Sequence, residues 1–340
     1  MNRFRVAIDG DFVKPDGSPA FPDFDLSALQ SDPRIQAEFV QLGPEIRPSA
    51  LEGFDALILL ISRFSGASVP PDGRLKLIAR FGVGYDTVDV DACTKTGIAL
   101  TITPSGVRRP VAVAILTFML ALAGRLMDKD RLTRQGPQGY ARRSDYMGVG
   151  LIGRTLASIG VGNIGSELFR IAKPLGMRFI ACDPYVDPAI PAGLGVQLVD
   201  LETVFREGDF VAANCPLTAE TRHIVNAERI ALMQPSAFLI NTARGPIVDQ
   251  AAITKALIER RIAGAALDVQ EQEPPDAADP LLALDNVILT PHALCWTDQC
   301  FAGIGASCVR SVFDVLEGRV PDGLVNSAVL GQAKWQGTRA

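Results

Sequence analysis

The 340-residue sequence has little histidine, few aromatic residues and no strongly basic segment. It contains only two histidines, so a general acid or base that works near neutral pH has few candidates. Aromatic residues make up 6% of the chain while small aliphatic residues dominate, which favours a mostly parallel sheet buried beneath helices. The formal charge of −5 and the lack of a polybasic tract argue against nucleic acid and membrane partners.

Neither a metal site nor a secretory or membrane segment is expected. The six cysteines contain no C-x-x-C pair and no metal-ligand spacing, so free thiols in a reducing cytoplasm are predicted. The N-terminus lacks the apolar stretch of a signal peptide and has the pattern of a first strand. The longest apolar run, Val111–Ala123, has thirteen residues, whereas a membrane-spanning helix needs about 20. A buried helix is therefore expected there.

A chain of this length favours two domains rather than one core. Strand-like and helix-like stretches alternate along it, which is typical of α/β domains with doubly wound parallel sheets. The stretch Lys14–Phe24 is rich in proline and glycine and is predicted to be a loop. In the first hundred residues, strands are predicted at Arg5–Asp9, Ala56–Ile61, Leu77–Phe81 and Ile98–Thr101, and a helix at Tyr85–Thr96.

The segment Thr101–Arg109 is predicted to cross between domains, and an apolar helix follows at Pro110–Ala123. The polar segment Arg131–Tyr146 is predicted to be a surface loop, or else a contact with a partner or the cofactor. Later strands are predicted at Leu156–Ile159, Arg178–Cys182, Phe210–Ala213, Ala237–Asn241, Gly264–Asp268 and Val287–Leu289. Later helices are predicted at Ile164–Leu175, Leu201–Arg206, Glu228–Met233, Gln250–Glu259 and Thr297–Glu317.

Three glycines in the middle of the chain have the spacing of a dinucleotide-binding loop. Gly160, Gly162 and Gly165 form G-x-G-x-x-G directly after an apolar strand and at the start of a helix. In such a loop the first glycine allows a tight turn, the second admits a pyrophosphate, and the third lets helix and strand pack closely. The amides of Asn163 and Ile164 then point toward the phosphates. The alternative is that these glycines serve only a tight turn.

Asp183 ends the next predicted strand, 18 residues after Gly165. Its carboxylate is expected to accept hydrogen bonds from the adenosine ribose hydroxyls and to repel a 2′-phosphate. No arginine or lysine follows at positions 184–187. The sequence therefore predicts NAD rather than NADP as the cofactor.

Arg244, Glu273 and His292 each follow a predicted strand, in the contexts N-T-A-R-G, D-V-Q-E-Q-E-P and L-T-P-H. Because ligands bind at the carboxyl ends of strands in an open α/β sheet, the three side chains are expected to meet there. The guanidinium can hold a carboxylate, the imidazole can exchange a proton near neutral pH, and the carboxylate can tune that imidazole.

Each of these residues also has a structural alternative. Arg244 could be a helix-cap or ion-pair residue, Glu273 a solvated loop acid, and His292 a core histidine with satisfied hydrogen bonds. His223, the other histidine, lies in a polar stretch with no matching role and is predicted to be a surface residue. Trp296 could line a substrate pocket or serve as a core or interface aromatic.

Four segments together resemble the D-isomer-specific 2-hydroxyacid dehydrogenases, of the phosphoglycerate dehydrogenase and glyoxylate–hydroxypyruvate reductase kind. They are the glycine loop, N-T-A-R-G-P-I-V-D, A-L-D-V-Q-E-Q-E-P and N-V-I-L-T-P-H. R-F-G-V-G-Y-D-T-V-D at Arg80–Asp89 is similar to that family's substrate-domain motif. The resemblance implies a discontinuous, flavodoxin-like substrate domain (1–104 and 295–340) and an NAD-binding Rossmann domain (105–294), with the active site between them.

The resemblance also implies catalytic roles. Arg244 would pair with the substrate carboxylate and the oxygen on C2. His292 would donate a proton to that oxygen while NADH delivers hydride to the carbon, with both roles reversed in oxidation. Glu273 would hydrogen-bond His292 and favour its charged form. Val83 and Gly84 would present backbone amides to the substrate carboxylate.

Further positions are implied for the cofactor and for assembly. Asp268 corresponds to a position near the nicotinamide carboxamide, and Thr242 would offer its backbone there. Pro216 and Thr221, in P-L-T-A-E-T, correspond to positions that approach the cofactor. The family also implies a homodimer formed largely through the cofactor domain, with Pro110–Ala123 as the candidate interface element.

The expected activity is NAD-dependent interconversion of a small 2-oxo acid, such as glyoxylate or hydroxypyruvate, and its D-2-hydroxy acid. Phosphoglycerate enzymes often carry an arginine near the end of the strand held here by Ala56–Ile61, where this chain is apolar and Arg63 comes later. The alternatives are a phosphoglycerate or phosphite dehydrogenase, and an NAD(H)-sensing protein like the family's corepressors. Ala112-Val113 stands where members of the family often have Ala-Glu, a difference that bears on helix docking and on the subunit interface.

Overall fold

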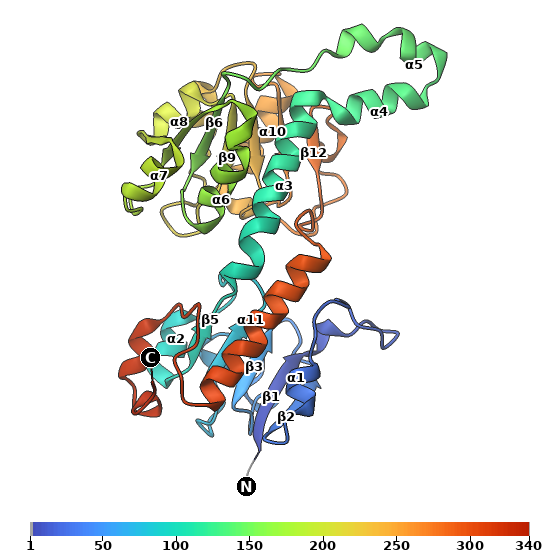
Figure 1. Ribbon diagram of the computed structural model, residues 1–340. Helices are drawn as coiled ribbons and strands as arrows, with labels where there is room; N and C mark the ends of the chain where they lie inside the picture. Colours follow the sequence, from blue (N-terminus) through green and yellow to red (C-terminus); the bar gives the residue numbers. More distant parts are fainter. Residues whose placement is uncertain (1–2, 340) are drawn as a thin grey trace. The chain divides into compact units, whose positions relative to one another are not determined.

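The computed structural model describes residues 3–339, which divide into two compact units (Figure 1). The first unit consists of Met1–Val107 and Trp296–Ala340, and the second of Arg108–Cys295. The two breaks in the chain fall after residues 107 and 295, where breaks after 104 and 294 are expected from the sequence. Both units are α/β folds with fully parallel sheets.

The sheet of the first unit has five strands in the order β2-β1-β3-β4-β5, all parallel. Strand β2 is missed from the sequence because its alternating pattern holds charged and polar residues and only one fully buried position, Ile35. The other strands fall within one or two residues of the predicted ranges. The strands are β1 (Phe4–Asp9), β2 (Ile35–Val40), β3 (Ala56–Leu59), β4 (Leu77–Arg80) and β5 (Ala99–Thr101).

Two helices of the first unit begin directly after a residue whose side chain caps them. In α2 (Val90–Thr96), the Asp89 carboxylate accepts the N–H of Ala92, and Gly97 at φ 75° ends the helix. The predicted helix start at Tyr85 is therefore too early, because Asp89 is the capping residue. Helix α11 (Asp298–Leu316) begins after Thr297, whose hydroxyl accepts the N–H of Cys300. A short helix, α1 (Ser27–Ser31), precedes β2.

The sheet of the second unit has seven strands in the order β12-β11-β10-β9-β6-β7-β8, again all parallel. Its order reverses at β6, which lies between β9 and β7, and this switch point is where nucleotides bind in doubly wound sheets. The strands are β6 (Thr155–Ile159), β7 (Arg178–Cys182), β8 (Val196–Leu198), β9 (Phe210–Ala213), β10 (Phe238–Asn241), β11 (Gly264–Leu267) and β12 (Val287–Leu289).

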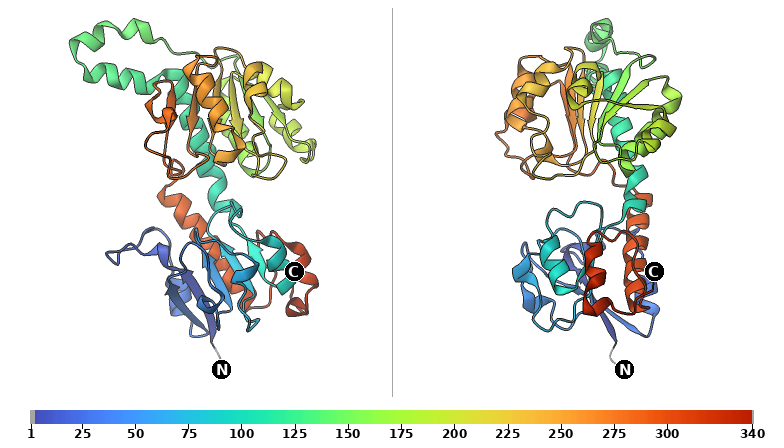
Figure 2. Two further views of the ribbon diagram at one scale, coloured as in Figure 1. Left: turned by 180° about the vertical axis from the view of Figure 1, so that it is seen from behind. Right: turned by 90° about the vertical axis from the view of Figure 1, so that its left-hand side faces the viewer.

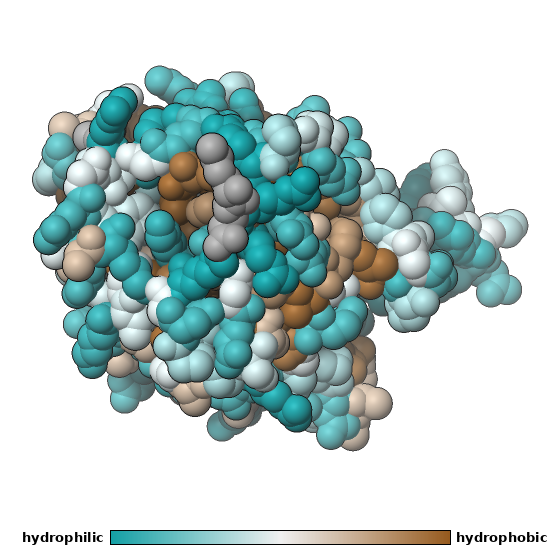
Figure 3. Space-filling view, turned by 90° about the horizontal axis from the view of Figure 1, so that it is seen from below, coloured by the Kyte–Doolittle hydropathy of each residue, from teal (hydrophilic) through white to brown (hydrophobic). Residues whose placement is uncertain are grey.

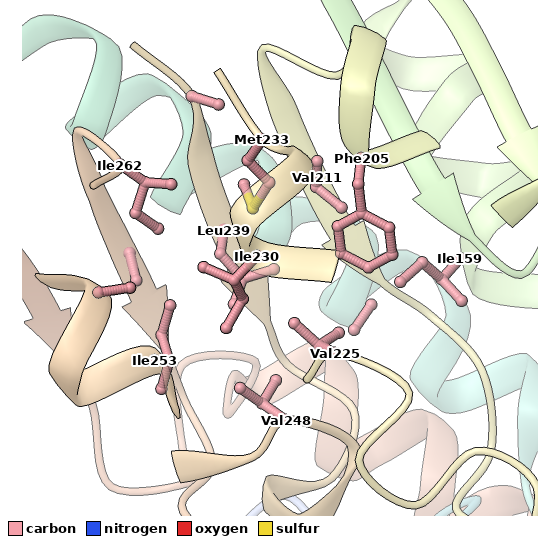
Figure 4. Close-up of a cluster of buried hydrophobic side chains, with 14 of the residues drawn as sticks. Ile159, Phe205, Val211, Val225, Ile230, Met233, Leu239, Val248, Ile253 and Ile262 are labelled. Carbon is pink, nitrogen blue, oxygen red and sulfur yellow. The ribbon is translucent and has the colours of Figure 1, made fainter. Parts of the chain in front are cut away.

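Helices cover both faces of this sheet (Figure 2). They are α6 (Asn163–Ala172), α7 (Ala189–Leu194), α8 (Leu201–Glu207), α9 (Ala227–Leu232) and α10 (Gln250–Ile258). The core between sheet and helices is built from aliphatic side chains around Phe205, Ile230 and Leu239, all almost inaccessible to solvent (Figure 4). This packing holds the strand ends, and with them the candidate site, in fixed positions.

Helix α3 is longer than expected, because it runs over Pro104–Gly124 and thus includes the segment predicted to be a crossover. Pro104 is the first residue of the helix, where a missing N–H costs nothing. Pro110, expected to open the helix, lies inside it. Its 21 residues could cross a membrane by length and composition, yet 61% of its most apolar window is buried within the protein. The expectation of a buried helix is thus confirmed for most of this window.

The segment Arg131–Tyr146 is mostly exposed, as predicted, but it is largely helical, so the prediction of a loop is wrong. Helices α4 (Leu126–Arg134) and α5 (Pro137–Ala141) form an arm that extends from the rest of the second unit (Figure 1). Ion pairs one turn apart stabilise α4, with Arg131 2.6 Å from Asp128 and Arg134 2.8 Å from Asp130. In the sequence, the spacing of three and four residues between these opposite charges is the pattern that could have predicted this helix.

Candidate active site

The three signature glycines surround the start of α6, and each meets a different constraint. Gly160 has φ 101°, and an added Cβ would lie 2.9 Å from the carbonyl oxygen of Asn214. An added Cβ on Gly165 would lie 2.6 Å from the carbonyl oxygen of Gly160. These two positions therefore require glycine for the packing of the loop itself.

Gly162 differs, because an added Cβ would have no atom within 4 Å. Gly162 caps α6 and supplies no side-chain hydrogen bond to it, so the first-turn amides, including those of Asn163 and Ile164, have no side-chain cap. Open space in front of uncapped helix amides is what a phosphate group requires. Packing within the protein therefore does not require glycine at this position.

Asp183 follows β7, next to the glycine loop, and its carboxylate is fixed by backbone groups. Oδ2 accepts the N–H of Val161 at 2.8 Å, and Oδ1 accepts the N–H groups of Tyr185 at 3.0 Å and Val186 at 3.1 Å. The sequence spacing thus places this acid beside the glycine loop, as predicted from the motif. Three backbone donors hold the negative charge at the carboxyl end of β7.

The segment after β9 forms a tight turn around Thr221. Its hydroxyl donates to the carbonyl of Pro216 at 2.6 Å, and the N–H of Thr218 donates to the same hydroxyl at 2.7 Å. Thr221 thereby shapes the turn that carries Pro216. Thr242, directly after β10, has a buried hydroxyl with no hydrogen-bond partner among the residues described. A buried hydroxyl without a partner costs free energy unless a ligand satisfies it.

Glu273 and His292 are brought together by the structure. His292 Nδ1 lies 2.8 Å from Glu273 Oε2, and the other carboxylate oxygen accepts the N–H of Gln270 at 3.0 Å. Both side chains are partly exposed, at 44% for His292 and 36% for Glu273. Since Nδ1 faces the carboxylate, Nε2 is the ring nitrogen left to meet a substrate.

The charge state of Glu273 follows from its neighbours. Burial raises the pKa of the carboxyl, but the hydrogen bond and charge of His292, the N–H of Gln270 and the positive charge of Arg244 outweigh it. The pKa of Glu273 therefore lies below its ordinary value. The carboxylate stays ionised at neutral pH, beside an imidazole and a guanidinium.

Arg244 lies on the loop after β10, the strand next to β11. Its Nη1 donates to the carbonyl of Ala243 at 2.7 Å, and its own carbonyl accepts Asn241 Nδ2 at 2.9 Å. The loop after β10 touches the loop after β11, because a Cβ on Gly245 would lie 1.8 Å from the carbonyl oxygen of Gln270. Glycine after Arg244 therefore allows the close approach of the two loops.

Asp268 holds the loop that carries His292. This residue is 2% exposed, and its Oδ1 accepts the hydroxyl of Thr290 at 2.5 Å and the N–H groups of Ala293 at 3.0 Å and Leu294 at 3.1 Å. Its backbone carbonyl accepts the N–H of His292 at 2.7 Å. This anchoring of the loop was missed in the sequence, which suggested only a position near the nicotinamide.

His223 was predicted to be a surface residue without a role, but its side chain is paired. Its Nε2 contacts the carboxylate of Glu271, two residues before Glu273. No signal in the sequence links these residues, which are 48 positions apart. Only the adjacency of two loops at the strand ends brings them together.

Val83 and Gly84 belong to the first unit and follow β4. The preceding glycine, Gly82, is fixed by Thr103, whose hydroxyl lies 3.1 Å from its N–H and 3.2 Å from its carbonyl oxygen. Trp296, in the same unit, is 52% exposed and meets the ring of Phe21 edge-on at 5.5 Å. Trp296 is thus part of an aromatic cluster with an exposed face.

Comparisons with known proteins agree with this geometry. The family model for the D-isomer specific 2-hydroxyacid dehydrogenase, NAD binding domain, matches residues 116–293. A glyoxylate reductase of Korarchaeum cryptofilum is 38% identical over 278 residues, which is 81% of this chain and 84% of the relative. A D-3-phosphoglycerate dehydrogenase of Methanocaldococcus jannaschii is 38% identical over 286 residues, 82% of this chain but 53% of the relative. The chain belongs to the D-isomer specific 2-hydroxyacid dehydrogenases.

A solved structure supports the same assignment. The D-lactate dehydrogenase from Aquifex aeolicus, complexed with NAD and lactic acid, superposes with a TM-score of 0.78 at 28% identity, covering 92% of this chain and 96% of that one. As a member of this family, the protein is an NAD-dependent oxidoreductase with an NAD-binding Rossmann domain. The open space at Gly162 and the unpartnered hydroxyl of Thr242 fit a bound dinucleotide.

Proposed function

We propose that this 2-hydroxyacid dehydrogenase interconverts a small 2-oxo acid and its D-2-hydroxy acid, with NAD(H) as the redox partner. The observation that carries the proposal is the pair formed by His292 Nδ1 and Glu273 Oε2 at 2.8 Å, with the charge of Arg244 acting on the same carboxylate. Glyoxylate and hydroxypyruvate are substrates of suitable size. Relatives named glyoxylate reductase support that choice.

In the proposed reaction, each residue of the trio has one task. Arg244 holds the substrate carboxylate and the oxygen on C2, since a guanidinium offers several donors in one plane. His292 donates a proton from Nε2 to that oxygen during reduction and takes it back during oxidation. Glu273 holds Nδ1, so the ring stays oriented with Nε2 toward the substrate. The bound NADH supplies the hydride that C2 receives.

For the cofactor, we propose that the first-turn amides of α6 at Asn163 and Ile164 meet the pyrophosphate in the space before Gly162. Asp183, fixed by three backbone donors, would hydrogen-bond the ribose hydroxyls and disfavour a 2′-phosphate. The segment Pro216–Thr221 and the loop residues Thr242 and Asp268 would line the remaining length of the dinucleotide.

For the substrate, we propose that the backbone amides of Val83 and Gly84 also bind its carboxylate, which makes the first unit the substrate domain. A phosphorylated substrate is less well supported. The carboxyl ends of β1 and β3 carry Asp9 and Ile61, and the Asp9 carboxylate accepts the N–H of Leu60 at 3.1 Å. A carboxylate and an apolar side chain at these positions do not favour the binding of a phosphate group. Arg63 lies farther along the chain and is exposed.

We further propose that the protein is a homodimer assembled through the second unit. Apolar side chains are exposed on α3 and on the arm, including Val113 at 46%, Leu126 at 59%, Met127 at 50% and Tyr140 at 62%. By contrast, the face drawn in Figure 3 is mainly hydrophilic, with its hydrophobic residues in small groups. The cysteine pattern, six residues without a C-x-x-C pair, supports a cytoplasmic location. Light scattering on the purified protein measures the subunit count directly.

One assay tests the catalytic proposal. Purified protein is mixed with NADH or NADPH and a panel of 2-oxo acids, and absorbance of the reduced cofactor is followed beside a His292→Ala variant. We expect turnover of at least one small 2-oxo acid, a preference for NADH, and a loss of about 10²-fold or more in kcat for the variant.

The other outcomes separate the alternatives. Turnover confined to 3-phosphoglycerate or phosphite, assayed with NAD, would favour those substrates instead. Tight NADH binding without turnover of any acid would favour an NAD(H) sensor. A His292→Ala variant with full activity would show that the proton donor lies elsewhere.

A further inference from the structure

A second histidine–carboxylate pair joins the segment after β9 to the loop after β11, which also carries Glu273. His223 follows β9, Glu271 follows β11, and His223 Nε2 contacts Glu271 Oε1. The two side chains are 39% and 31% exposed, so the pair is only partly screened by water. Neither residue has a part in the proton or hydride transfer described above.

The backbone of His223 is tied to the loop that carries Arg244. The N–H of His223 donates to the carbonyl of Pro246 at 2.8 Å, and the N–H of Val225 donates to that of Ile247 at 3.1 Å. His223 has φ 52°, a left-handed conformation that residues other than glycine seldom adopt. Such a conformation persists only where surrounding contacts hold it. The backbone of His223 is therefore bonded to Pro246, which follows Arg244 by two residues in the sequence.

Glu271 is tied to the other side of the site. Its N–H donates to Gln250 Oε1 at 2.8 Å, and Gln250 Nε2 donates to Asp279 Oδ2 at 2.5 Å. The neighbouring residue, Gln270, donates its N–H to Glu273 Oε1 at 3.0 Å. Glu271 thus lies within the short turn whose amide orients Glu273.

We infer that His223 and Glu271 are positioning residues, which lock the loop of Arg244 to the turn of Glu273 and so hold His292 in its reactive orientation. The inference rests on the proposed function, in which His292 donates the proton. The pair acts through other residues and touches no reacting atom. Without it, the turn at 270–273 keeps its backbone bond to Gln250 but loses its side-chain link to the β9 loop.

The variants follow from the geometry. Glu271→Ala removes the link and leaves the backbone bond to Gln250 in place. Glu271→Gln keeps an oxygen that can accept from His223. His223→Asn suits the left-handed backbone but is too short to reach Glu271. Asp285→Ala, which removes an exposed pair with Arg260 at 2.5 Å, is the matched control.

Turnover of a 2-oxo acid with NADH is measured first in the wild-type protein. Absence of turnover there would contradict the proposed function rather than this inference. We expect Glu271→Ala and His223→Asn to lower kcat by about tenfold, since small misplacements of catalytic groups are costly. The deuterium isotope effect from labelled NADH should rise in both. Glu271→Gln should retain most activity, the double variant should be no worse than either single one, and Asp285→Ala should match wild type.

A second readout does not need turnover. The protein has only two histidines, so His223→Asn leaves His292 as the sole imidazole signal in a nitrogen NMR spectrum. In the neutral ring, wild type should carry the proton on Nδ1, facing Glu273, and Glu271→Ala and His223→Asn should mix this with the Nε2 tautomer. Unchanged kcat, isotope effect and tautomer in both variants would overturn the inference. A lower melting temperature alone would show that the pair only stabilises the fold.

Discussion

The backbone carbonyl of Asp268 accepts the N–H of His292 at 2.7 Å, while the buried carboxylate of the same Asp268 accepts three donors from Thr290, Ala293 and Leu294. His292 itself has φ 53°, so its backbone is held in a left-handed conformation. One residue after β11 therefore fixes the loop after β12 from both sides. The imidazole meets Glu273 because of this anchor.

Replacing Asp268 should loosen that loop. Asp268→Ala leaves Thr290 Oγ1 and two backbone N–H groups without an acceptor, which should cost about 1–3 kcal/mol of stability, and kcat should fall with it. Asp268→Asn keeps one acceptor and should lie between wild type and the alanine variant. Urea unfolding and steady-state kinetics measure both. Equal stability for all three proteins would show that the anchor contributes little.

Two glycine substitutions should separate folding from cofactor binding. Gly165→Ala places a methyl group 2.6 Å from the carbonyl oxygen of Gly160 and should lower stability by about 1–3 kcal/mol. Gly162→Ala meets no protein atom within 4 Å, and its φ of −67° suits alanine, so stability should be unchanged.

The methyl group of Gly162→Ala should instead weaken NADH binding by about tenfold or more, because it occupies the space proposed for the pyrophosphate. Thermal unfolding without cofactor and fluorescence titration with NADH distinguish the two variants. Undiminished NADH affinity in Gly162→Ala would place the phosphates elsewhere.

Charge at Asp183 should set the choice of cofactor. Asp183→Asn keeps one oxygen for the amides of Tyr185 and Val186 but removes the negative charge. The ratio of kcat/KM for NADPH to that for NADH should rise by about tenfold, because repulsion of the 2′-phosphate is relieved. Using the ratio cancels any general loss of activity. If the ratio stayed constant, another group would discriminate between the cofactors.

The ionised form of Glu273 should contribute to stability in a defined pH range. Its pKa is lower in the folded protein than the ordinary value of 4.5, so its contribution is present above that value and is lost as the pH falls through the folded pKa. The difference in unfolding free energy between wild type and Glu273→Gln should therefore shrink from pH 6 to about pH 3.5. Urea unfolding across this range is the measurement. A difference that stays constant with pH would contradict the assignment.

Much of the fold follows from local pattern. The strands from β6 to β12, apart from β8, were predicted because fully buried parallel strands form short apolar runs between turns. β2 and β8 were missed, since both lie at sheet edges and expose polar side chains. The helices of the arm at 126–146 were missed because the segment is mostly polar and exposed and shows no long apolar face.

The sequence by itself determined the chemistry that is available to this protein. Motif spacing places Asp183 next to the glycine loop, and strand order brings Arg244, Glu273 and His292 to one edge, because parallel strands share their carboxyl ends. Only the tertiary structure decided how those groups are held. Asp268 anchors the loop of His292, and His223 reaches Glu271 across 48 positions, through contacts between loops. Such contacts depend on how neighbouring strand ends pack, and no local pattern encodes them.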